Sequence, residues 1–339
     1  MADLTGMMQA AAGAGGVADG SYIAFVNSGT PYFTLLNHNL GSVSLATTYV
    51  LNGTQGRGVR FSPSGDYIAA ASSGASASVT LLDHTTPGTV TLAATYLTPS
   101  TATKVSFSPS GDYLAVTSAT LNPRFTLLDH TTPGTLTLAA TYTLSNDGQG
   151  VDFSPSGEYI AVGVSSTPSF TLLDHTTPGT VSLAATYTVA NTGNSVAFSP
   201  SGDYIAVAHN ATPYFTLLNH TTPGTVSLAT TYVIGGASTV ANGTAFSPSG
   251  DYIGVASQIN RFTLLDHTTP GTVSLATTYT LAGNGNKVAF SPSGNYIAVA
   301  HGVTPYFTLL DHTTPGTVSL ATTYTVAATL GQDVAFSPN

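Results

Sequence analysis

Residues 198–208 read FSPSGDYIAVA, and this stretch decides the fold because the chain repeats it along its length. The motif FSPSG, or the shortened copy FSPN at the end, begins at Phe61, Phe107, Phe153, Phe198, Phe246, Phe290 and Phe336. A second motif, TLLDH or a close variant, ends at His38, His84, His130, His175, His220, His267 and His312. One pattern therefore returns every 44 to 48 residues, and seven units at such a spacing indicate a repeat architecture.

Each unit contains four short stretches of strand-forming composition, separated by Gly, Pro, Ser and Asp or Asn. In one unit these stretches are residues 195–198, 203–208, 214–218 and 225–233, named strands a, b, c and d. The SPSG link between a and b favours a tight hairpin, because Pro presets one turn dihedral and Gly supplies the next. Seven antiparallel four-stranded units predict an all-β protein, a seven-bladed β-propeller with one sheet per blade.

The repeated FSPSGDYIAVA resembles the signature of WD-repeat-like and YVTN-type β-propellers, in which FSPDG-type hairpins join the innermost strand to the next. The resemblance covers residues 20–339 and recurs in all seven units. A Leu-Asp pair, such as Leu128-Asp129, lies where the family has Trp-Asp, and the chain contains no Trp. The resemblance therefore implies the same seven-bladed fold, without the Trp of the family's structural hydrogen-bond tetrad.

The two ends of the chain predict how the ring closes. The first unit starts at the strand b position, with residues 20–24, and an orphan strand a lies at residues 333–336. Together they would complete one blade, which leaves no unpaired terminal sheet. We therefore predict a propeller over residues 19–339, preceded by a flexible or docking N-terminal arm over residues 1–18.

Composition excludes several classes of function. Only 6% of the 339 residues are charged, and the net charge of -9 disfavours nucleic acid as a partner. The chain has no Cys, so no thiolate nucleophile or Cys-ligated zinc site is possible. No apolar run reaches the roughly 18 residues that span a bilayer, so we expect no membrane insertion.

Histidines beside Asp or Asn in the c-to-d turns raise the question of a metal or catalytic site. Neighbouring residues on a strand point to opposite faces, and the copies are spread around a ring. An Asx-type turn, in which the Asp or Asn side chain holds the TTPG backbone, explains them better. The chain also lacks a nucleophile elbow, a P-loop and an H-E-x-x-H motif. We therefore predict no catalytic residues, no metal and no cofactor.

Comparison of the units divides the loops between two faces. The a-to-b and c-to-d turns are almost invariant and define a uniform face, whereas the b-to-c and d-to-a loops vary and define a variable face at the opposite end of the strands. All six cations lie in or next to the variable loops, and ten acids lie on the repeated turns. Loops on a rigid scaffold commonly carry recognition, so we expect the variable face to bind a partner through Tyr32, Arg57, Arg60, Lys104, Arg124, His209, Tyr214, Arg261, Lys287, His301 and Tyr306.

These observations favour a non-enzymatic structural or interaction protein, displayed on a larger assembly such as a phage virion or another extracellular particle. The arm or the uniform face would contact neighbouring subunits, and the variable face would bind a surface glycan or protein. A soluble glycan- or peptide-binding module is the first alternative.

An enzyme is the second alternative, because the resemblance implies that the central channel can host lactonase or lyase chemistry. Such an enzyme needs His, Glu or Arg side chains facing inward from strand a or from the d-to-a loops. Six charged residues are candidates, and they are distributed over several blades: Arg57, Arg60, Lys104, Asp152, Lys287 and Asp333.

Overall fold

Twenty-eight β-strands follow one another in the computed structural model, which describes residues 20–74, 79–235, 239–326 and 330–338. The strands at position a are β4 (Gln55–Phe61), β8 (Ala102–Phe107), β12 (Gly148–Phe153), β16 (Gly193–Phe198), β20 (Ala241–Phe246), β24 (Gly285–Phe290) and β28 (Gly331–Phe336). Those at position b are β1 (Tyr22–Asn27), β5 (Tyr67–Ser73), β9 (Tyr113–Ser118), β13 (Tyr159–Val164), β17 (Tyr204–His209), β21 (Tyr252–Ser257) and β25 (Tyr296–His301).

The outer half of each sheet consists of one c and one d strand. The strands at position c are β2 (Tyr32–Asn39), β6 (Val79–Asp83), β10 (Arg124–Asp129), β14 (Phe170–Asp174), β18 (Tyr214–Asn219), β22 (Arg261–Asp266) and β26 (Tyr306–Asp311). Those at position d are β3 (Ser42–Val50), β7 (Thr91–Tyr96), β11 (Thr137–Thr143), β15 (Ser182–Tyr187), β19 (Ser227–Val233), β23 (Ser274–Thr280) and β27 (Ser319–Thr325).

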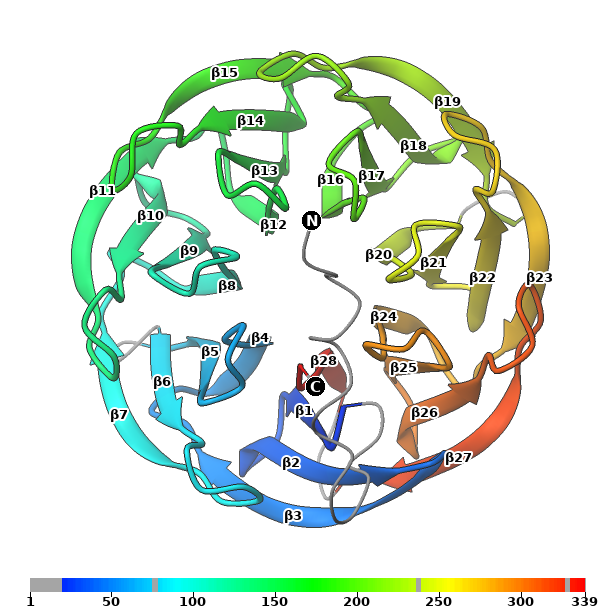
Figure 1. The fold of residues 1–339 in the computed structure, drawn as a ribbon, viewed down its shortest axis with the longest axis horizontal. Coiled ribbons are helices and arrows are strands. Elements are labelled where there is room, and N and C mark those ends of the chain that lie inside the picture. The colour runs from blue at the N-terminus through cyan, green and yellow to red at the C-terminus, as the bar shows by residue number, and fades with distance from the viewer. Residues whose placement is uncertain (1–19, 75–78, 236–238, 327–329, 339) are drawn as a thin grey trace, which may run out of the picture.

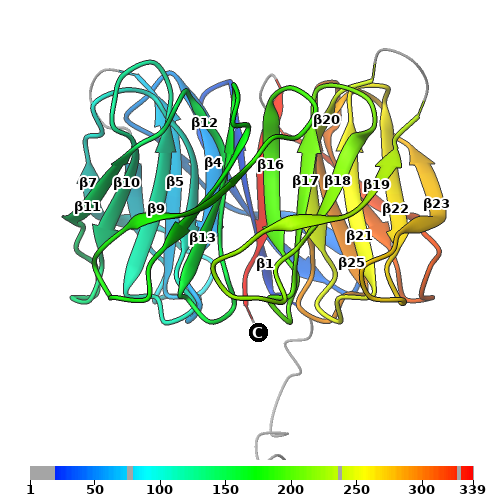
Figure 2. The ribbon, with the colours of Figure 1, turned by 90° about the horizontal axis from the view of Figure 1, so that it is seen from above.

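These strands form seven antiparallel four-stranded sheets arranged in a ring (Figure 1). Blades 2 to 7 each take four consecutive strands, from β4–β7 to β24–β27, and blade 1 has the order β28-β1-β2-β3. The a strands line a central channel and the d strands form the outer rim. Figure 2 shows the ring from the side. The predicted seven-bladed propeller is confirmed.

Ring closure follows the predicted arrangement. β28 pairs antiparallel with β1, with Ala335 opposite Ala24 and Val334 opposite Phe25. The last described strand therefore supplies the innermost strand of the first blade. The predicted arm at residues 1–18 lies outside the described residues.

The hydrophobic core lies between the blades rather than in one central mass. Seven clusters of buried side chains each join strands of two successive blades. The Phe near the start of strand c is completely buried in six blades, at Phe33, Phe125, Phe170, Phe215, Phe262 and Phe307. The repeated aromatic residues therefore pack the blades together, since a buried aromatic ring contributes a large apolar surface.

The repeated His of the c-to-d turn joins two turns and two blades. In blade 4, His175 Nδ1 donates to the carbonyl of Gly157 at 2.9 Å, and His175 Nε2 accepts from Gly179 N–H at 3.3 Å. The imidazole also meets Tyr113 of blade 3 edge-on, with ring centroids 5.0 Å apart. The adjacent Asp174 accepts from both the backbone N–H and the hydroxyl of Thr176, which confirms the predicted Asx turn.

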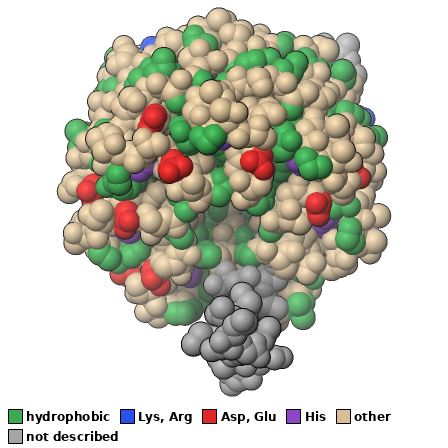
Figure 3. Space-filling view, turned by 45° about the horizontal axis from the view of Figure 1, so that its top comes forward, with side chains coloured by type: hydrophobic (Ala, Val, Ile, Leu, Met, Phe, Trp, Pro, Cys, Tyr) green, Lys and Arg blue, Asp and Glu red, His purple; other side chains and the backbone are tan. Residues whose placement is uncertain are grey.

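Acidic side chains surround the uniform face, with His side chains beside them (Figure 3). Most of these acids are the turn residues that the repeat pattern assigns to this face. No helix that is long and apolar enough to cross a bilayer occurs among the described residues.

Candidate active site in the central channel

The innermost strand of each blade has a β-bulge near its start. In blade 5 the pairing of β16 with β17 passes from Gly193 directly to Ser195, so Asn194 is the extra residue. The other six blades show the same irregularity at the equivalent place. A bulge disturbs the strict alternation of side chains, and we infer that it turns two successive residues of each strand toward the channel.

Three rings of side chains consequently line the channel. The upper ring is nearest the variable face and contains Arg57, Thr103, Gln149, Asn194, Asn242, Asn286 and Gln332. The middle ring contains Gly58, Lys104, Gly150, Ser195, Gly243, Lys287 and Asp333. The lower ring contains Arg60, Ser106, Asp152, Ala197, Ala245, Ala289 and Ala335.

These rings hold four of the six cations of the chain, Arg57, Arg60, Lys104 and Lys287, together with two carboxylates. They border cavities of about 230 Å³ at the upper ring, about 280 Å³ beside the lower ring and about 450 Å³ at the uniform-face mouth. A chain with only six cations thus gathers four of them where a small molecule can enter.

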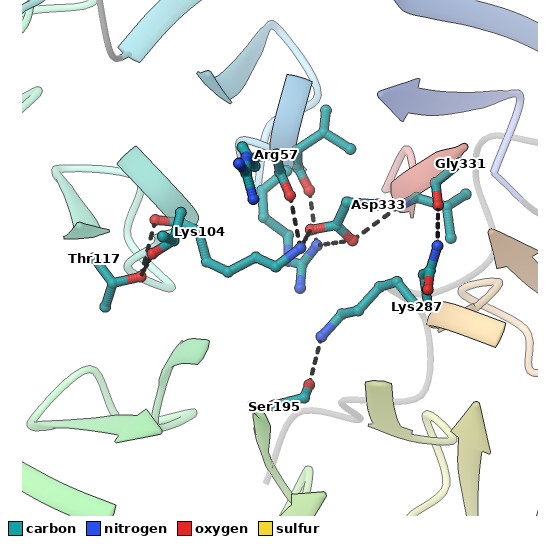
Figure 4. Close-up of polar contacts among 12 residues, drawn as sticks. Arg57, Lys104, Thr117, Ser195, Lys287, Gly331 and Asp333 are labelled. Carbon is teal, nitrogen blue, oxygen red and sulfur yellow. Dashed lines mark hydrogen bonds and ion pairs between the residues drawn. The ribbon is translucent and has the colours of Figure 1, made fainter. Parts of the chain in front are cut away.

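Asp333 is the centre of the charged cluster. Its carboxylate lies 3.1 Å from Lys104 Nζ and 3.4 Å from Arg60 Nη1, and its side chain is only 1% exposed. Burial by itself would raise the pKa of Asp333, but Lys104, Arg60 and Lys287 together lower it. Asp333 therefore carries its negative charge in the channel and holds the two neighbouring cations in place (Figure 4).

Lys287 has a neutral partner instead. Its Nζ donates to Ser195 Oγ at 2.8 Å, and Lys287 is only 6% exposed. Burial, aided by the nearby positive charge of Arg60, lowers the pKa of Lys287 to about 7. A lysine with such a pKa has a large neutral fraction at neutral pH and can accept a proton.

Asp152 is the second carboxylate of the channel. It accepts hydrogen bonds from Phe198 N–H at 2.9 Å and from Ser106 Oγ at 3.3 Å. Burial raises its pKa, although the Phe198 hydrogen bond and the positive charges of Arg60 and Lys287 oppose this shift. Asp333 and Asp152 therefore have pKa values shifted in opposite directions within one channel, as is frequent among functional groups.

Asparagines of the upper ring line the cavity at the channel mouth. The Nδ2 groups of Asn194, Asn242 and Asn286 donate to backbone carbonyls of the next blade, at 2.8, 2.8 and 2.6 Å respectively. These hydrogen bonds join successive blades, and Asn286 Oδ1 also accepts from Asn242 Nδ2 at 3.5 Å.

The predicted variable-face residues separate into three groups. Arg57 lies in the upper ring, Lys104 and Lys287 lie in the middle ring, and Arg60 lies in the lower ring. The enzyme alternative had taken the charged residues to be scattered across blades. These residues do come from different blades, but Arg60 and Lys104 both contact Asp333, because equivalent positions of the innermost strands converge on the ring axis.

Two of the predicted binding residues are not at the surface. His209 and His301 are completely buried, and each Nε2 lies 3.0 Å from a threonine hydroxyl of the neighbouring strand, Thr216 or Thr308. Burial lowers the pKa of each of these histidines to about 4. Both are therefore neutral core residues at ordinary pH, and placing them on the binding surface was wrong.

The remaining predicted residues lie at the starts of c strands. Tyr32, Tyr214 and Tyr306 pack against the hydrophobic clusters of their blades, and Tyr214 is only 5% exposed. Arg124 pairs with Asp147 at 3.3 Å, and Arg261 begins β22. A partner that binds these residues stays a prediction.

Sequence reasoning missed Ser195. Its position in strand a matches that of Lys104, Lys287 and Asp333 when the blades are aligned, and this alignment was the available signal. Within the described residues, no group of three or more His, Asp or Glu side chains could hold a metal ion.

No protein-family model and no curated protein matches the chain in sequence. Solved structures match it closely in shape. The periplasmic gluconolactonase PpgL of Pseudomonas aeruginosa is 15% identical, with a TM-score of 0.79 over 93% of this chain and 99% of that one. A putative 6-phosphogluconolactonase of Bacteroides uniformis is 14% identical, with a TM-score of 0.79 over 93% and 99%. A functionally unknown protein of Desulfotomaculum acetoxidans is 12% identical, with a TM-score of 0.78 over 94% and 100%.

These likenesses show a shared propeller fold. They contradict the prediction of a non-enzymatic structural protein displayed on a virion, because the names among them are those of a gluconolactonase and of putative 6-phosphogluconolactonases. The lactonase alternative agrees with the comparisons better than the display function does. The charged and polar side chains of the channel are therefore the residues to consider for a reaction.

Proposed function

We propose that this chain is a hydrolase that opens small lactones in its central channel. The concentration of charge in the channel carries the proposal: Arg60, Lys104, Lys287, Asp152 and Asp333 lie around water-accessible cavities in a chain that is only 6% charged. The names of the similar structures, gluconolactonase and putative 6-phosphogluconolactonase, suggest lactones as the substrate class.

The chemistry of lactone opening fits these groups. Attack on the lactone carbonyl places negative charge on its oxygen, and fixed cations in a partly water-excluded site stabilise that charge. Arg60 is suited to this role because it faces the cavity beside the lower ring. The Oδ1 atoms of Asn194, Asn242 and Asn286 would accept hydrogen bonds from hydroxyl groups of a sugar-like ring.

The size of the channel cavities limits the substrate. Volumes of about 230 and 280 Å³ lie at the lower end of the range for ligand pockets. A monosaccharide-sized lactone suits such a volume, whereas an oligosaccharide or a peptide would not enter it.

The experiment compares acid release from glucono-lactone by the wild-type chain and by Arg60→Met, in a pH-stat and after subtraction of spontaneous hydrolysis. We expect Arg60→Met to lower kcat by about 10²-fold, the usual effect of removing one group that stabilises an oxyanion. Arg124→Met is the matched variant, because Arg124 also pairs with an aspartate, at 3.3 Å, but on the variable rim.

The channel proposal requires Arg124→Met to retain activity within about twofold. A larger loss in Arg124→Met than in Arg60→Met would move the site to the rim. Hydrolysis no faster than the spontaneous rate across a panel of aldonolactones would refute the proposal.

A further inference from the structure

Ser195 and Lys287 form a pair that reaches across one whole blade. Ser195 belongs to β16 of blade 5 and Lys287 to β24 of blade 7, yet Lys287 Nζ and Ser195 Oγ are 2.8 Å apart. Figure 4 shows both side chains pointing into the channel, with that contact between them. The backbone N–H of Thr244, in the intervening blade 6, also donates to Ser195 Oγ at 3.3 Å. Two contacts therefore fix the position of this hydroxyl.

A glycine opens the path that Lys287 takes. Gly243 has the equivalent position in blade 6, and a Cβ there would lie 2.7 Å from Lys287 Cα and 3.3 Å from its Cδ. Gly58 does the same for Lys104, which crosses blade 2 to reach Asp333. In both places a lysine passes over a glycine of the intervening blade. The two lysines differ in their hydrogen-bond partner, which is the carboxylate of Asp333 for Lys104 and the hydroxyl of Ser195 for Lys287.

The hydrogen-bond partner of each lysine affects whether its amine is charged or neutral. Burial lowers the pKa of both lysines. The carboxylate of Asp333, in direct contact with Lys104, opposes this shift, whereas the direct partner of Lys287 is a neutral hydroxyl. The charged groups around Lys287 are Arg60 and Lys104, which lower its pKa, and Asp333 and Asp152, which raise it. When Lys287 is neutral, its lone pair can accept the proton of Ser195 Oγ, as in serine hydrolases that use a lysine base.

We propose that Ser195 is the nucleophile of the hydrolase and that Lys287 is its general base. This inference rests on the proposed function and adds a covalent intermediate to it. The geometry carries it: the 2.8 Å contact, the Thr244 N–H that positions the hydroxyl, and the cavity of about 280 Å³ that Lys287 lines together with Arg60.

The reaction balances in two steps. Ser195 Oγ bonds to the lactone carbonyl carbon as its proton passes to Lys287 Nζ, and collapse of the oxyanion breaks the ring C–O bond. The ring oxygen leaves as a hydroxyl with the proton from Lys287. A water molecule then attacks the acyl carbon and gives its proton to Lys287, and the second collapse returns that proton to Ser195 Oγ. The sum adds one water to the lactone and yields a hydroxy acid.

The test detects the covalent intermediate without relying on lactone turnover. The wild-type chain is incubated with p-nitrophenyl acetate at pH 8, quenched in acid, and examined by intact mass and peptide mapping. The chain has no cysteine to compete for the acyl group. We expect one acetyl group on Ser195, none in Ser195→Ala, and labelling at least ~100-fold slower in Lys287→Met.

The control variant is Ser257→Ala, which removes another completely buried serine hydroxyl, one that donates to the Arg261 carbonyl away from the channel. It should be labelled like the wild type. The labelling rate should rise with pH with a midpoint near 7, where Lys287 loses its proton. Thermal unfolding of each variant establishes that it folds, and mapping the wild-type label identifies the nucleophile even if a variant does not fold.

The outcomes separate this inference from the proposed function. Acetylation of Ser195 without any lactone hydrolysis would support the nucleophile and refute the substrate class. Lactone hydrolysis that Ser195→Ala retains at the wild-type rate would support the proposed function and overturn the Ser195–Lys287 assignment. A label on any residue other than Ser195 would also overturn it.

Discussion

Gly243 shows how a glycine, which has no side chain, leaves room in the channel for the side chain of a neighbouring blade. Its absent Cβ leaves room for Lys287 to pass over blade 6, and the same holds for Gly58 and Lys104. In a ring of nearly identical blades, the functional differences are therefore made by small residues as much as by the charged residues that they admit.

We predict that Gly243→Ala destabilises the chain by about 1–3 kcal/mol, the cost of overpacking a close contact. The new Cβ would lie 2.7 Å from Lys287 Cα and 2.8 Å from the Asn286 carbonyl, both of which belong to the backbone and cannot rotate away. Urea unfolding measures the loss of stability. Displacement of Lys287 should also reduce acetylation of Ser195.

Gly302→Ala is the control for this substitution. A Cβ at Gly302 meets nothing closer than Leu330 Cδ2 at 3.5 Å, which is ordinary van der Waals contact. It should change the free energy of unfolding by less than about 0.5 kcal/mol. Equal effects of the two substitutions would argue against the close packing of blades 6 and 7.

The sequence predicts individual packing residues better than it predicts the channel pairs. A buried Phe or Tyr repeats at one position in each unit, and its role follows from that regularity. The contact of Lys104 with Asp333 joins residues 229 positions apart and depends on the gap at Gly58. No local pattern encodes such a contact, so the charged residues were assigned to a face and not to one another.

At the scale of the strand, the β-bulge is the feature that periodicity does not reveal. Strict alternation would send Asn194 and Ser195 to opposite sides of β16, but the bulge lies between the paired residues Gly193 and Ser195. The turns, in contrast, follow from composition, because the Asp, Thr and Gly of the c-to-d link each supply a known turn function.

The histidine of the c-to-d turn connects its own blade to strand b of the adjacent blade. We predict that His175→Ala lowers the free energy of unfolding by about 2–4 kcal/mol, because it removes two partly buried hydrogen bonds and two edge-on aromatic contacts. Chemical denaturation followed by circular dichroism measures this loss.

His267→Ala should cost nearly the same, since His267 makes the equivalent contacts in blade 6. Thr177→Ala, on an exposed position of the same turn as His175, should be nearly neutral. A small effect in His175→Ala together with a large one in His267→Ala would show that the blades do not share one mode of packing.

At the scale of the whole molecule, the ring is held closed by hydrogen bonds between β28 and β1 and not by a covalent link. The sequence predicts this closure in full, because the first unit lacks a strand that the end of the chain supplies. The seven blades and their antiparallel order were equally predictable. The use of the channel was not, since it depends on how residues from separate blades meet at the axis.

We predict that a chain ending at Leu330 loses the closed ring, because β1 then exposes an unpaired edge. Its midpoint of thermal unfolding should fall by at least ~10 °C, and light scattering should detect association of the exposed edges. A synthetic peptide of residues 330–339 added in excess should restore both properties. A truncated chain that stays monomeric with an unchanged midpoint would contradict a role for β28 in stability.

The position of the seam also sets the order in which the channel is assembled during synthesis. The ribosome makes β1, β2 and β3 first, and these strands remain an incomplete sheet until β28 emerges after all the other described strands. β28 carries Asp333, the carboxylate that pairs with Arg60 and Lys104. A nascent chain that has not yet reached β28 therefore has these cations without Asp333, so the ring and the complete charged cluster arise together when β28 is added.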